Sequence, residues 1–509
     1  MLVQEFLEAS ADRLPDKIAL VCDGQRLTYA EIEARANRLA HALMAKGVRR
    51  GDRVVTYLPN SVELVVSIFG ALKAGAVFVV VNHTTKHDKL LYILNNCQAG
   101  ALISAGAQAG LAADVAGQTP SLRAVVLTEP FDSDLRLPEA LTFADVESRF
   151  EATRPRRQNI DLDLACLIYT SGSTGDPKGV MSDHSNVVFA ASSIIQYLEN
   201  TEDDIVIDVL PLSFDYGLYQ LLMAFKFGGT LVLERGFAFP AQILKRIETE
   251  RVTGFPGVPT LYAVLVQMDL SPYDLSSLRY LTNTAAALPP AHITELRFKF
   301  PWARLYSMYG LTETKRTLYL PPEQLDKRPG SVGIAIPGTE VWLVDEEGNR
   351  LPNGSMGELV ARGRHVMRGY WGDPEMTAMR YRPGPIPGER VCYTGDLFRS
   401  DEEGYMYFVA RKDDIIKSRG EKVAPKEVET VLYQLKGVTE AAVVGVPDPL
   451  LGQAVKAFVV VSGGQTLTEA EVIRHCRANL EDFMIPKYVE FVAELPKTSS
   501  GKIKKTDLK

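Results

Sequence analysis

Short apolar runs alternate with longer amphipathic segments through most of the first 310 residues. The longer segments space their apolar residues three or four positions apart, which predicts helices that bury one face. The short runs are rich in β-branched residues, which predicts buried strands. We predict helices at 29–46, 62–73, 86–96, 186–198, 218–227, 241–250, 260–268 and 291–298, and strands at 52–58, 76–81, 101–104, 123–128, 166–169, 205–210, 230–233, 254–256, 278–282 and 304–309. This alternation indicates an α/β fold with largely parallel sheets covered by helices on both faces.

The hydrophobic pattern changes near residue 333. Strand-like runs at 340–344, 357–360, 389–396 and 405–408 are separated by turns that contain Gly, Pro and Asp. This texture predicts a small β-rich antiparallel subdomain at about 333–410. A charged stretch follows, and helix and strand patterns then resume over about 90 residues, an ordinary size for a compact α+β unit. We therefore predict an N-terminal domain over residues 1–412 and a C-terminal domain over residues 413–509.

The composition narrows the class of protein. The chain has 509 residues, 46% of them hydrophobic and 23% charged, which is typical of a globular protein with more than one core. A formal net charge of −7 gives no reason to expect nucleic acid or an anionic membrane as partner. Five scattered cysteines without C-x-x-C spacing argue against a zinc site or disulfide framework, and they favour a cytoplasmic location. Glu63 and Lys73 interrupt the apolar stretch 62–81, which favours a helix and a strand over a membrane span.

Residues 166–180, CLIYTSGSTGDPKGV, join a predicted strand to a loop rich in hydrogen-bond donors. Glycines free backbone N–H groups, hydroxyls add further donors, and Lys178 adds a cation. Such a loop suits phosphate binding. It is not a Walker loop, because Pro177 stands where that motif has its second glycine, and Gly179 follows the lysine where the motif has Ser or Thr. Considered alone, the segment could also be a surface turn.

Four further segments follow in order: YSMYGLTET at 306–314, YTGDLF at 393–398, RKDDIIKSRGEKVAPKEVE at 411–429 and LPKTSSGKIKK at 495–505. Together with TSGSTGDPKGV, this set resembles the adenylate-forming superfamily of acyl-CoA synthetases, peptide-synthetase adenylation domains and luciferase-like ligases. The resemblance covers the chain from end to end. It implies a large N-terminal domain, built from two αβ-layered subdomains and a small β-barrel, and a mobile α+β C-terminal lid. The active site is then expected between the two.

Members of this superfamily activate a carboxylic acid with ATP and release pyrophosphate, which implies ATP and Mg²⁺ as cofactors. The step depends on positioning and charge neutralisation, so no protein nucleophile is needed. The resemblance implies that ATP or AMP is bound by Thr170, Ser171, Gly172, Ser173, Thr174, Gly175, Lys178, Ala285, Ala286, Tyr309, Gly310, Asp396 and Arg411. It makes Glu313 the Mg²⁺ ligand, a hard oxygen donor suited to that ion, with Thr312 beside it. Without the resemblance, 309–313 could be a capped helix start and Asp396 part of a turn.

The lid carries two candidate catalytic lysines. Lys502, in SSGKIK, corresponds to the lysine that reaches the α-phosphate and the substrate carboxylate in the family. Lys417 is the candidate for the second half-reaction, on a face that replaces that of Lys502 when the lid turns about the hinge residue Asp413. Lys417 could instead be an exposed surface lysine. The chain has Lys504 where family members often have arginine.

The implied acyl pocket is lined by residues 211–218 and 282–287, including Phe214, Asp215, Tyr216 and Thr284. Asp215 stands where amino-acid-adenylating domains bind the substrate ammonium, which indicates an amino-acid substrate. SFDYG together with TETKRTLYLPPEQL is, however, also similar to coronafacic-acid-type ligases, which join a carboxylic acid to an amino acid. Asp215 could alternatively cap the helix predicted at 218–227.

We predict a ligase that adenylates a small-molecule carboxylic acid and transfers the acyl group to a thiol, either CoA or a carrier protein. Amide formation with an amino acid or amine is the alternative. A degenerate nucleotide-binding regulatory protein is a second alternative, against which stands the presence of Lys178, Glu313, Asp396, Arg411 and Lys502. Neither nucleic acid nor membrane is a predicted partner.

Overall fold

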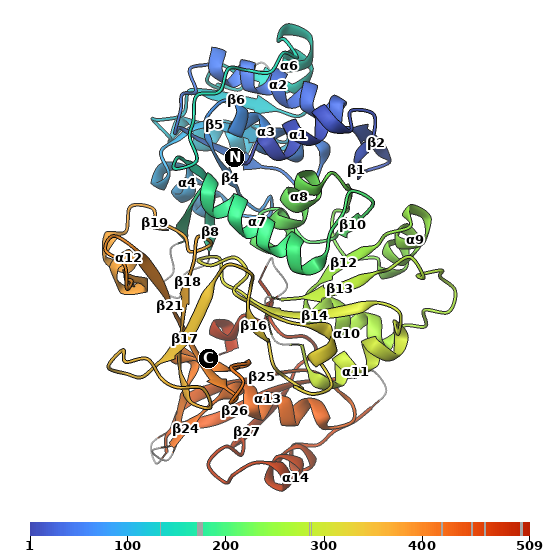
Figure 1. The fold of residues 1–509 in the computed structure, drawn as a ribbon, viewed down its shortest axis with the longest axis vertical. Helices are drawn as coiled ribbons and strands as arrows, with labels where there is room; N and C mark the ends of the chain where they lie inside the picture. The colour runs from blue at the N-terminus through green and yellow to red at the C-terminus, as the bar shows by residue number, and fades with distance from the viewer. Residues whose placement is uncertain are drawn as a thin grey trace.

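The structure is a computed structural model that describes residues 1–132, 134–170, 177–284, 286, 288–418, 421–448, 451–462, 465–498 and 502–508, apart from the side chains of Asp413, Lys417 and Lys422. The N-terminal residues occupy one end of an elongated molecule and the C-terminal residues the other (Figure 1). A large part built of sheets and helices is followed by a smaller mixed part, which confirms the predicted α/β fold class.

Two mainly parallel sheets build the N-terminal part. The first has the strand order β16-β15-β14-β13-β12-β10-β11-β1-β2, and the second β19-β9-β8-β4-β3-β5-β6-β7. The first contains β1 (Ile18–Cys22), β2 (Gln25–Thr28), β10 (Ile205–Asp208), β11 (Thr230–Leu233), β12 (Gly254–Gly257), β13 (Tyr280–Asn283), β14 (Arg304–Tyr309), β15 (Leu318–Leu320) and β16 (Ile334–Ala335). The second contains β3 (Arg53–Tyr57), β4 (Val77–Val80), β5 (Ala99–Ser104), β6 (Ala124–Leu127), β7 (Leu141–Thr142), β8 (Leu164–Thr170), β9 (Lys178–Asp183) and β19 (Gly369–Tyr370). Antiparallel pairs occur only toward the sheet edges among the described strands.

Helices pack between and around these sheets (Figure 1). They are α1 (Glu5–Arg13), α2 (Tyr29–Ala45), α3 (Val62–Lys73), α4 (His87–Asn96), α5 (Ala109–Gly117), α6 (Phe143–Arg149), α7 (His184–Leu198), α8 (Asp215–Phe227), α9 (Pro240–Glu250), α10 (Pro259–Gln267) and α11 (Pro290–Lys299), with 3₁₀ turns η1 (Gly106–Gln108) and η2 (Pro322–Gln324). Helix α3 is buried on nearly every side, which explains its apolar sequence all round. Its first turn is capped by Ser61, whose Oγ accepts a hydrogen bond from the backbone N–H of Leu64.

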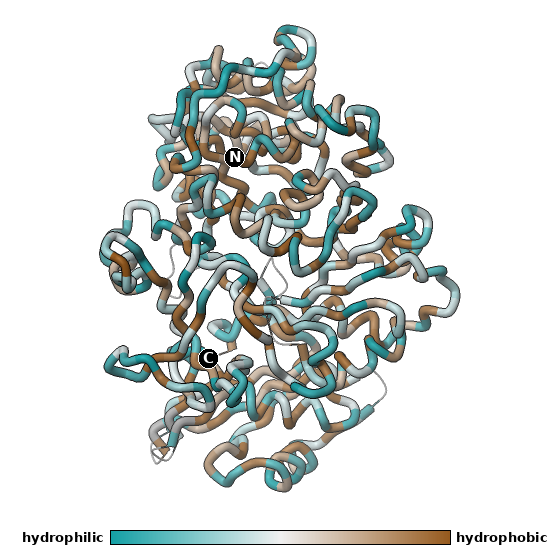
Figure 2. Tube along the Cα trace, in the orientation of Figure 1, coloured by the Kyte–Doolittle hydropathy of each residue, from teal (hydrophilic) through white to brown (hydrophobic). Residues whose placement is uncertain are grey.

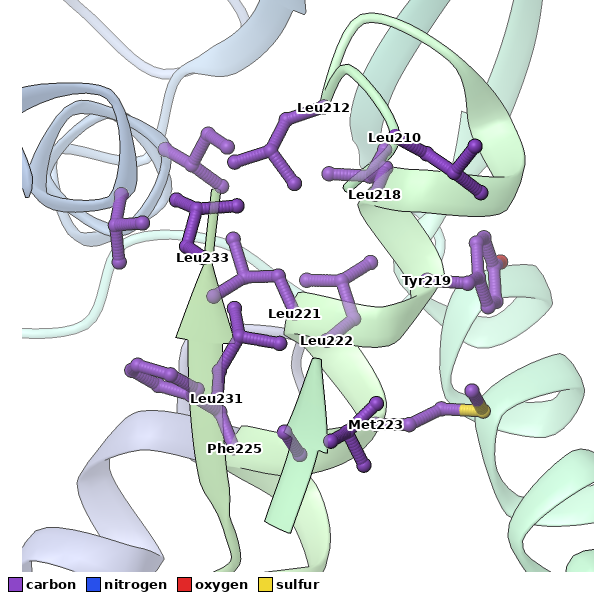
Figure 3. Packing of buried hydrophobic residues seen from close by; sticks show 14 of the residues in the cluster. Leu210, Leu212, Leu218, Tyr219, Leu221, Leu222, Met223, Phe225, Leu231 and Leu233 are labelled. Atoms are coloured by element: carbon purple, nitrogen blue, oxygen red, sulfur yellow. The ribbon is translucent and has the colours of Figure 1, made fainter. Parts of the chain in front are cut away.

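Helix α8 links the hydrophobic core to the centre of the molecule. Leu221, Leu222 and Phe225 pack toward β11, whereas Tyr219 projects from another side of the helix (Figure 3). The helix ends at Gly228, whose φ of 83° is a left-handed conformation that glycine adopts without strain. Hydrophobic residues of this kind concentrate along the inner strands and helix faces, while hydrophilic residues follow the outer loops (Figure 2). The core therefore holds the start of α8 in a fixed place.

The β-rich section forms an antiparallel sheet, as its sequence pattern predicts, at the place where the family resemblance implies a small β-barrel. Its strands are β17 (Glu340–Val344), β18 (Met356–Arg362), β20 (Tyr381–Pro383), β21 (Arg390–Ser400) and β22 (Met406–Arg411), and α12 (Pro374–Arg380) packs beside it. The turn η3 (Lys412–Asp414) then leads into the C-terminal part. That part contains β23 (Ile416–Ser418), β24 (Glu421–Val423), α13 (Pro425–Gln434), β25 (Val438–Asp448), β26 (Gly452–Val461), α14 (Glu469–Asn479), β27 (Tyr488–Phe491) and η4 (Lys505–Leu508). The domain boundary at 412/413 stays a prediction.

The structure contains several elements that were not predicted from the sequence, including β1, β2, α5 and α12. Helix α1 was not predicted, and α6 lies within 129–159, which the pattern indicates as irregular. Strand β9 continues directly from the glycine-rich loop and pairs antiparallel with β8. Because β9 contains the polar residues Lys178, Ser182 and Asp183, it has no continuous apolar run, and the hydrophobic pattern does not predict it as a strand. Residues 62–81 form helix α3 and strand β4, as predicted, and no helix in the described ranges is both long and apolar enough to cross a bilayer.

Candidate active site

A short crossing strand ties Glu313 to the end of the glycine-rich loop. Strand β19 pairs with β9, and the backbone N–H of Trp371 donates to the carbonyl of Gly179 at 2.7 Å. The hydroxyl of Tyr370 donates to Oε1 of Glu313 at 2.6 Å. Nζ of Lys178 lies over the ring of the same tyrosine, 5.9 Å from its centre. One tyrosine thus holds the predicted metal ligand and the predicted phosphate-binding lysine close together.

Tyr309, Asp396 and Arg411 form a second group. The hydroxyl of Tyr309 donates to Oδ2 of Asp396 at 2.6 Å, and Nε of Arg411 lies 3.7 Å from Oδ1. The pairing of β21 with β22 sets Asp396 opposite Arg411, while Phe398 packs edge-on against the Tyr309 ring. Burial raises the pKa of Asp396, and the charge of Arg411 opposes that rise. The carboxylate retains acceptor capacity for further donors, such as a pair of hydroxyl groups.

Lys502 reaches this region from the C-terminal part. Its Nζ lies 5.6 Å from the ring centre of Phe214, which precedes α8. Desolvation lowers the pKa of Lys502 to about 8; Arg411 also lowers it, and Glu313 and Asp396 oppose the change. The residue as a whole is half-buried, and the charged groups that shift the pKa of its ammonium all belong to the N-terminal part. The structure brings together a lysine and carboxylates that lie far apart in the sequence.

The segment after Tyr309 forms a tight turn. It is not the start of a capped helix, which the sequence alone would allow. A Cβ on Gly310 would lie 1.9 Å from the carbonyl oxygen of Lys315, so only glycine fits there. Lys315 itself has a φ of 56°, which is uncommon for a residue with a side chain. The turn places the half-buried Thr312 and Glu313 on one side of the chain and directs Lys315 into the interior.

Asp215 is the first residue of α8 and is already paired with cations. Phe214, not Asp215, occupies the N-cap position, so the helix-cap interpretation of Asp215 is wrong. Nζ of Lys315 lies 2.7 Å from Oδ1 of Asp215, and Nη1 of Arg316 lies 3.5 Å from Oδ2. The hydroxyl of Tyr216 donates to the carbonyl of Thr282 at 2.8 Å, which fixes the helix start against β13.

No role in the site was predicted from the sequence for Lys315, Arg316 or Tyr370. The available signal for the first two was a pair of adjacent cations directly before TLYL, a run that reads as a buried strand. Their common partner Asp215 lies on a distant segment, so only the fold reveals the cluster.

The remaining predicted site residues are placed as follows. Thr170 ends β8 opposite Lys178 on β9, and the carbonyl of Ala286 accepts a hydrogen bond from Nδ2 of Asn283 at 3.1 Å. Thr284 is buried, and its Oγ1 has no hydrogen-bond partner within the described ranges. Ser171, Gly172, Ser173, Thr174, Gly175 and Ala285 lie outside the described residues, as do the side chains of Lys417 and Asp413.

Comparison with known proteins identifies the class. A family model described as AMP-binding enzyme matches residues 7–371, and one described as AMP-binding enzyme C-terminal domain matches residues 427–502. The chain belongs to the AMP-binding enzyme family, and the predicted membership of the adenylate-forming superfamily is confirmed.

Similar proteins include CoA ligases and an amide bond synthetase. A feruloyl-CoA synthase from an Amycolatopsis species is 36% identical over 501 residues, which cover 97% of this chain and 96% of that protein. The structure of anthranilate CoA ligase AuaEII in complex with anthranoyl-AMP matches with a TM-score of 0.91 and 31% identity, covering 100% of this chain and 96% of that one. Amide bond synthetase McbA from Marinactinospora thermotolerans matches with a TM-score of 0.88 and 28% identity, covering 100% and 99%.

Proposed function

We propose that this protein adenylates a small carboxylic acid with ATP and then transfers the acyl group to a thiol, either CoA or a carrier protein. In the first step a carboxylate oxygen forms a bond to the α-phosphorus, the bond to the bridging oxygen breaks, and pyrophosphate leaves. In the second step the thiol sulfur bonds to the acyl carbon, the thiol proton is lost, and AMP leaves. The acid supplies the nucleophile of the first step and the thiol that of the second. The protein therefore acts by positioning and charge stabilisation.

The observation that carries this proposal is the position of Lys502. Its ammonium lies 5.6 Å from the ring centre of Phe214, and the charges of Glu313 and Asp396 raise its pKa against the effect of desolvation; all three residues belong to the N-terminal part. A cation in this place can stabilise the charge that develops on a phosphate and hold an acid substrate beside it. Tyr309, Asp396 and Arg411 then provide a ring surface and a carboxylate suited to an adenosine group.

The phosphate end is assigned to the other side of the same site. Lys178, together with the loop residues 170–175, would bind the β- and γ-phosphates. Glu313 fits a Mg²⁺ ion, because this ion takes one or two carboxylates and completes its shell with phosphate oxygens and water. When bound, Mg²⁺ would neutralise phosphate charge. Tyr370 would orient the Glu313 carboxylate through its 2.6 Å hydrogen bond, and Thr312 would lie beside it.

For the second step we propose that the C-terminal part turns about Asp413 and exchanges the Lys502 face for the Lys417 face. A hinge confined to one or two residues is a common mode of domain rearrangement. The 3₁₀ turn η3, which contains Asp413, supplies a short connection between β22 and β23. Phe214, Tyr216 and Thr284 would line the acyl pocket during both steps.

The direct test is acid-dependent release of pyrophosphate. The full chain is incubated with ATP, Mg²⁺ and a panel of aliphatic and aromatic acids, and pyrophosphate is measured together with the acyl-adenylate by mass spectrometry. We expect at least one acid to release pyrophosphate without any acceptor. Bound nucleotide but no release with any acid of the panel would contradict the adenylation step and favour a regulatory nucleotide-binding protein.

An amine acceptor is the second candidate, favoured by the full-length match to amide bond synthetase McbA. The acceptors are distinguished by adding CoA or a set of amines to the acyl-adenylate that has accumulated on the enzyme. Rapid formation of acyl-CoA together with AMP supports the thiol reaction. Amide formation at submillimolar amine, with no acceleration by CoA, would replace the thiol by an amine.

A further inference from the structure

Asp215, Lys315 and Arg316 form a buried ion cluster at the start of α8. The side chains of Lys315, Arg316 and Asp215 are 0%, 4% and 5% exposed. Lys315 also lies over the ring of Tyr219 and Arg316 over that of Tyr216, with distances of 5.6 and 4.4 Å to the ring centres. Charged groups so completely removed from water are stable only when their charges are compensated.

The cluster has more positive than negative charge. Lys315 and Arg316 share one carboxylate, that of Asp215, and within the described ranges neither has an ion pair with another. Asp208 is a second buried carboxyl group near Tyr216, but burial raises its pKa well above the usual range, which favours the neutral acid. In their usual ionised forms the three residues therefore carry one surplus positive charge.

The backbone at Lys315 has a conformation that is strained for a residue with a long side chain. Its φ of 56° lies in the left-handed region, where glycine or asparagine would be the least strained choice. A long cationic side chain at such a position, fully buried, costs both backbone strain and desolvation. The neighbouring Arg316 adds a second buried cation, although one would already neutralise Asp215.

The cluster adjoins the proposed acyl pocket. Asp215 follows Phe214, whose ring centre lies 5.6 Å from the Lys502 ammonium, and Tyr216 is hydrogen-bonded to Thr282, the first residue of the second segment assigned to the pocket. An acid with its reacting carboxyl at Lys502 would thus extend past Phe214 toward the cluster. Because Asp215 is already engaged by two cations, it is a poor partner for a substrate ammonium, which the surplus charge would repel.

We propose that Lys315 and Arg316 form an anion subsite at the inner end of the acyl pocket, which selects acids that carry a second carboxylate remote from the reacting one. This proposal rests on the proposed adenylation function. The second carboxylate would neutralise the surplus charge and accept charge-assisted hydrogen bonds from the guanidinium and ammonium groups. Asp215 is then a positioning residue that holds the two cations, and amino acids are disfavoured substrates.

The test compares acids of one shape that differ only at the remote end. Pyrophosphate release is measured for benzoates with a 4-carboxylate, 4-methyl or 4-aminomethyl group, and for linear acids of four to eight carbons with the same three ends. We expect kcat/KM to be about tenfold or more higher for the carboxylate than for the methyl group in at least one series, with the ammonium lowest. A methyl or ammonium preference in both series would overturn the proposal.

Variants identify the residues that are responsible. In Arg316→Met the ratio of kcat/KM for the carboxylate-bearing acid to that for its methyl counterpart should fall by about tenfold, mainly through KM. In Asp215→Asn that ratio should rise, since a neutralising charge is removed. As a control, Arg26→Met removes a distant exposed arginine paired with Glu250 and should leave the ratio unchanged.

Failures of the two proposals are distinguishable. If no acid releases pyrophosphate with the wild-type chain, the adenylation function is wrong. If acids do release it, but the ratio is equal in wild type and Arg316→Met, only the anion subsite is wrong. Loss of activity toward amino acids in Asp215→Asn, together with a wild-type preference for them, would instead make Asp215 an ammonium ligand.

Discussion

Two regions of this molecule bury a lysine, and they treat its charge differently. In the N-terminal region, Nζ of Lys73 lies 2.8 Å from both Glu8 and Glu33, and Arg154 bonds to Glu33 and to Asp12. In the central region, Lys315 and Arg316 share Asp215 alone among the described carboxylates. In the first network Arg157 also lies 3.7 Å from Glu8, so three cations face three carboxylates, and the network reaches the surface through Arg154 and Arg157. The second network is buried and has two cations for one carboxylate.

The difference separates a structural from a functional use of buried charge. A compensated network joins α1, α2 and α3 and needs no further charge from a ligand. An uncompensated cluster costs stability unless something else supplies the missing charge. Where that cluster borders a proposed substrate pocket, the substrate is the natural source. The following predictions test this distinction, beginning with the largest effect.

Lys502→Ala should have the largest effect, because it removes the lysine of the C-terminal part whose ammonium lies over the ring of Phe214. We expect acyl-adenylate formation to fall by about 10²–10³-fold. The second half-reaction, started from synthetic acyl-adenylate, should be largely retained. Pyrophosphate exchange measures the first step and AMP release the second. Near-normal pyrophosphate exchange in the variant would contradict the role given to Lys502.

Lys73→Met should destabilise the fold without changing chemistry. It leaves Glu8 and Glu33 close together with only the exposed arginines Arg157 and Arg154 to compensate them, so we expect a loss of about 3 kcal/mol in the free energy of unfolding. Urea titration followed by circular dichroism gives this value. The kcat/KM of the folded protein should stay within about twofold of wild type, since the network lies outside the proposed site.

Two other variants sharpen that result. Lys245→Met removes an exposed lysine paired with Glu248 and should cost less than about 1 kcal/mol. Arg316→Met removes the surplus cation of the central cluster, so it should also cost less than Lys73→Met, by about 1.5 kcal/mol or more. Equal destabilisation by Arg316→Met and Lys73→Met would mean that the two regions do not differ in the way described.

Tyr370→Phe should have an intermediate effect on activity. The variant loses the hydrogen bond to Glu313, so we expect about a tenfold higher Mg²⁺ requirement for adenylation. Tyr381→Phe is the matched control, because the Tyr381 hydroxyl is buried nearby yet has no hydrogen-bond partner within the described ranges. Activity measured across a Mg²⁺ titration should change only for Tyr370. Equal changes in both variants would assign the effect to packing.

The pH dependence should show the smallest effect. Desolvation lowers the pKa of Lys502 to about 8, so this ammonium loses its proton as the pH rises through that value. Adenylation should therefore decline above about pH 8, whereas at lower pH the charged form is fully present. In Lys502→Arg, where the side chain stays charged, the decline should move to higher pH. An unchanged alkaline limb in that variant would assign the decline to another group.

Sequence reasoning reached the local features and missed the long-range pairs. Helix α3 was predicted with its observed bounds, because the apolar residues that define it are contiguous in the sequence. The motifs around Lys178, Glu313, Asp396 and Lys502 could be found because each is continuous in the sequence. The residues that contact these motifs lie on distant segments. The sequence alone does not show that Asp215 pairs with Lys315, or that Tyr370 bonds to Glu313.

The ribbon of β21 and β22 has a consequence beyond holding Asp396 and Arg411. Lys426, near the start of α13, donates from Nζ to the carbonyl of Phe408 on β22 at 3.3 Å and lies over the ring of the same residue. Phe408 also contacts Phe398, and both lie beside Tyr309. The two-stranded ribbon of β21 and β22 therefore contacts the C-terminal part and also forms one side of the site around Asp396. A ligand that binds against this ribbon and orders it would therefore change the preferred orientation of the C-terminal part. Because such coupling is reciprocal, a change in that orientation would also change the affinity for the ligand.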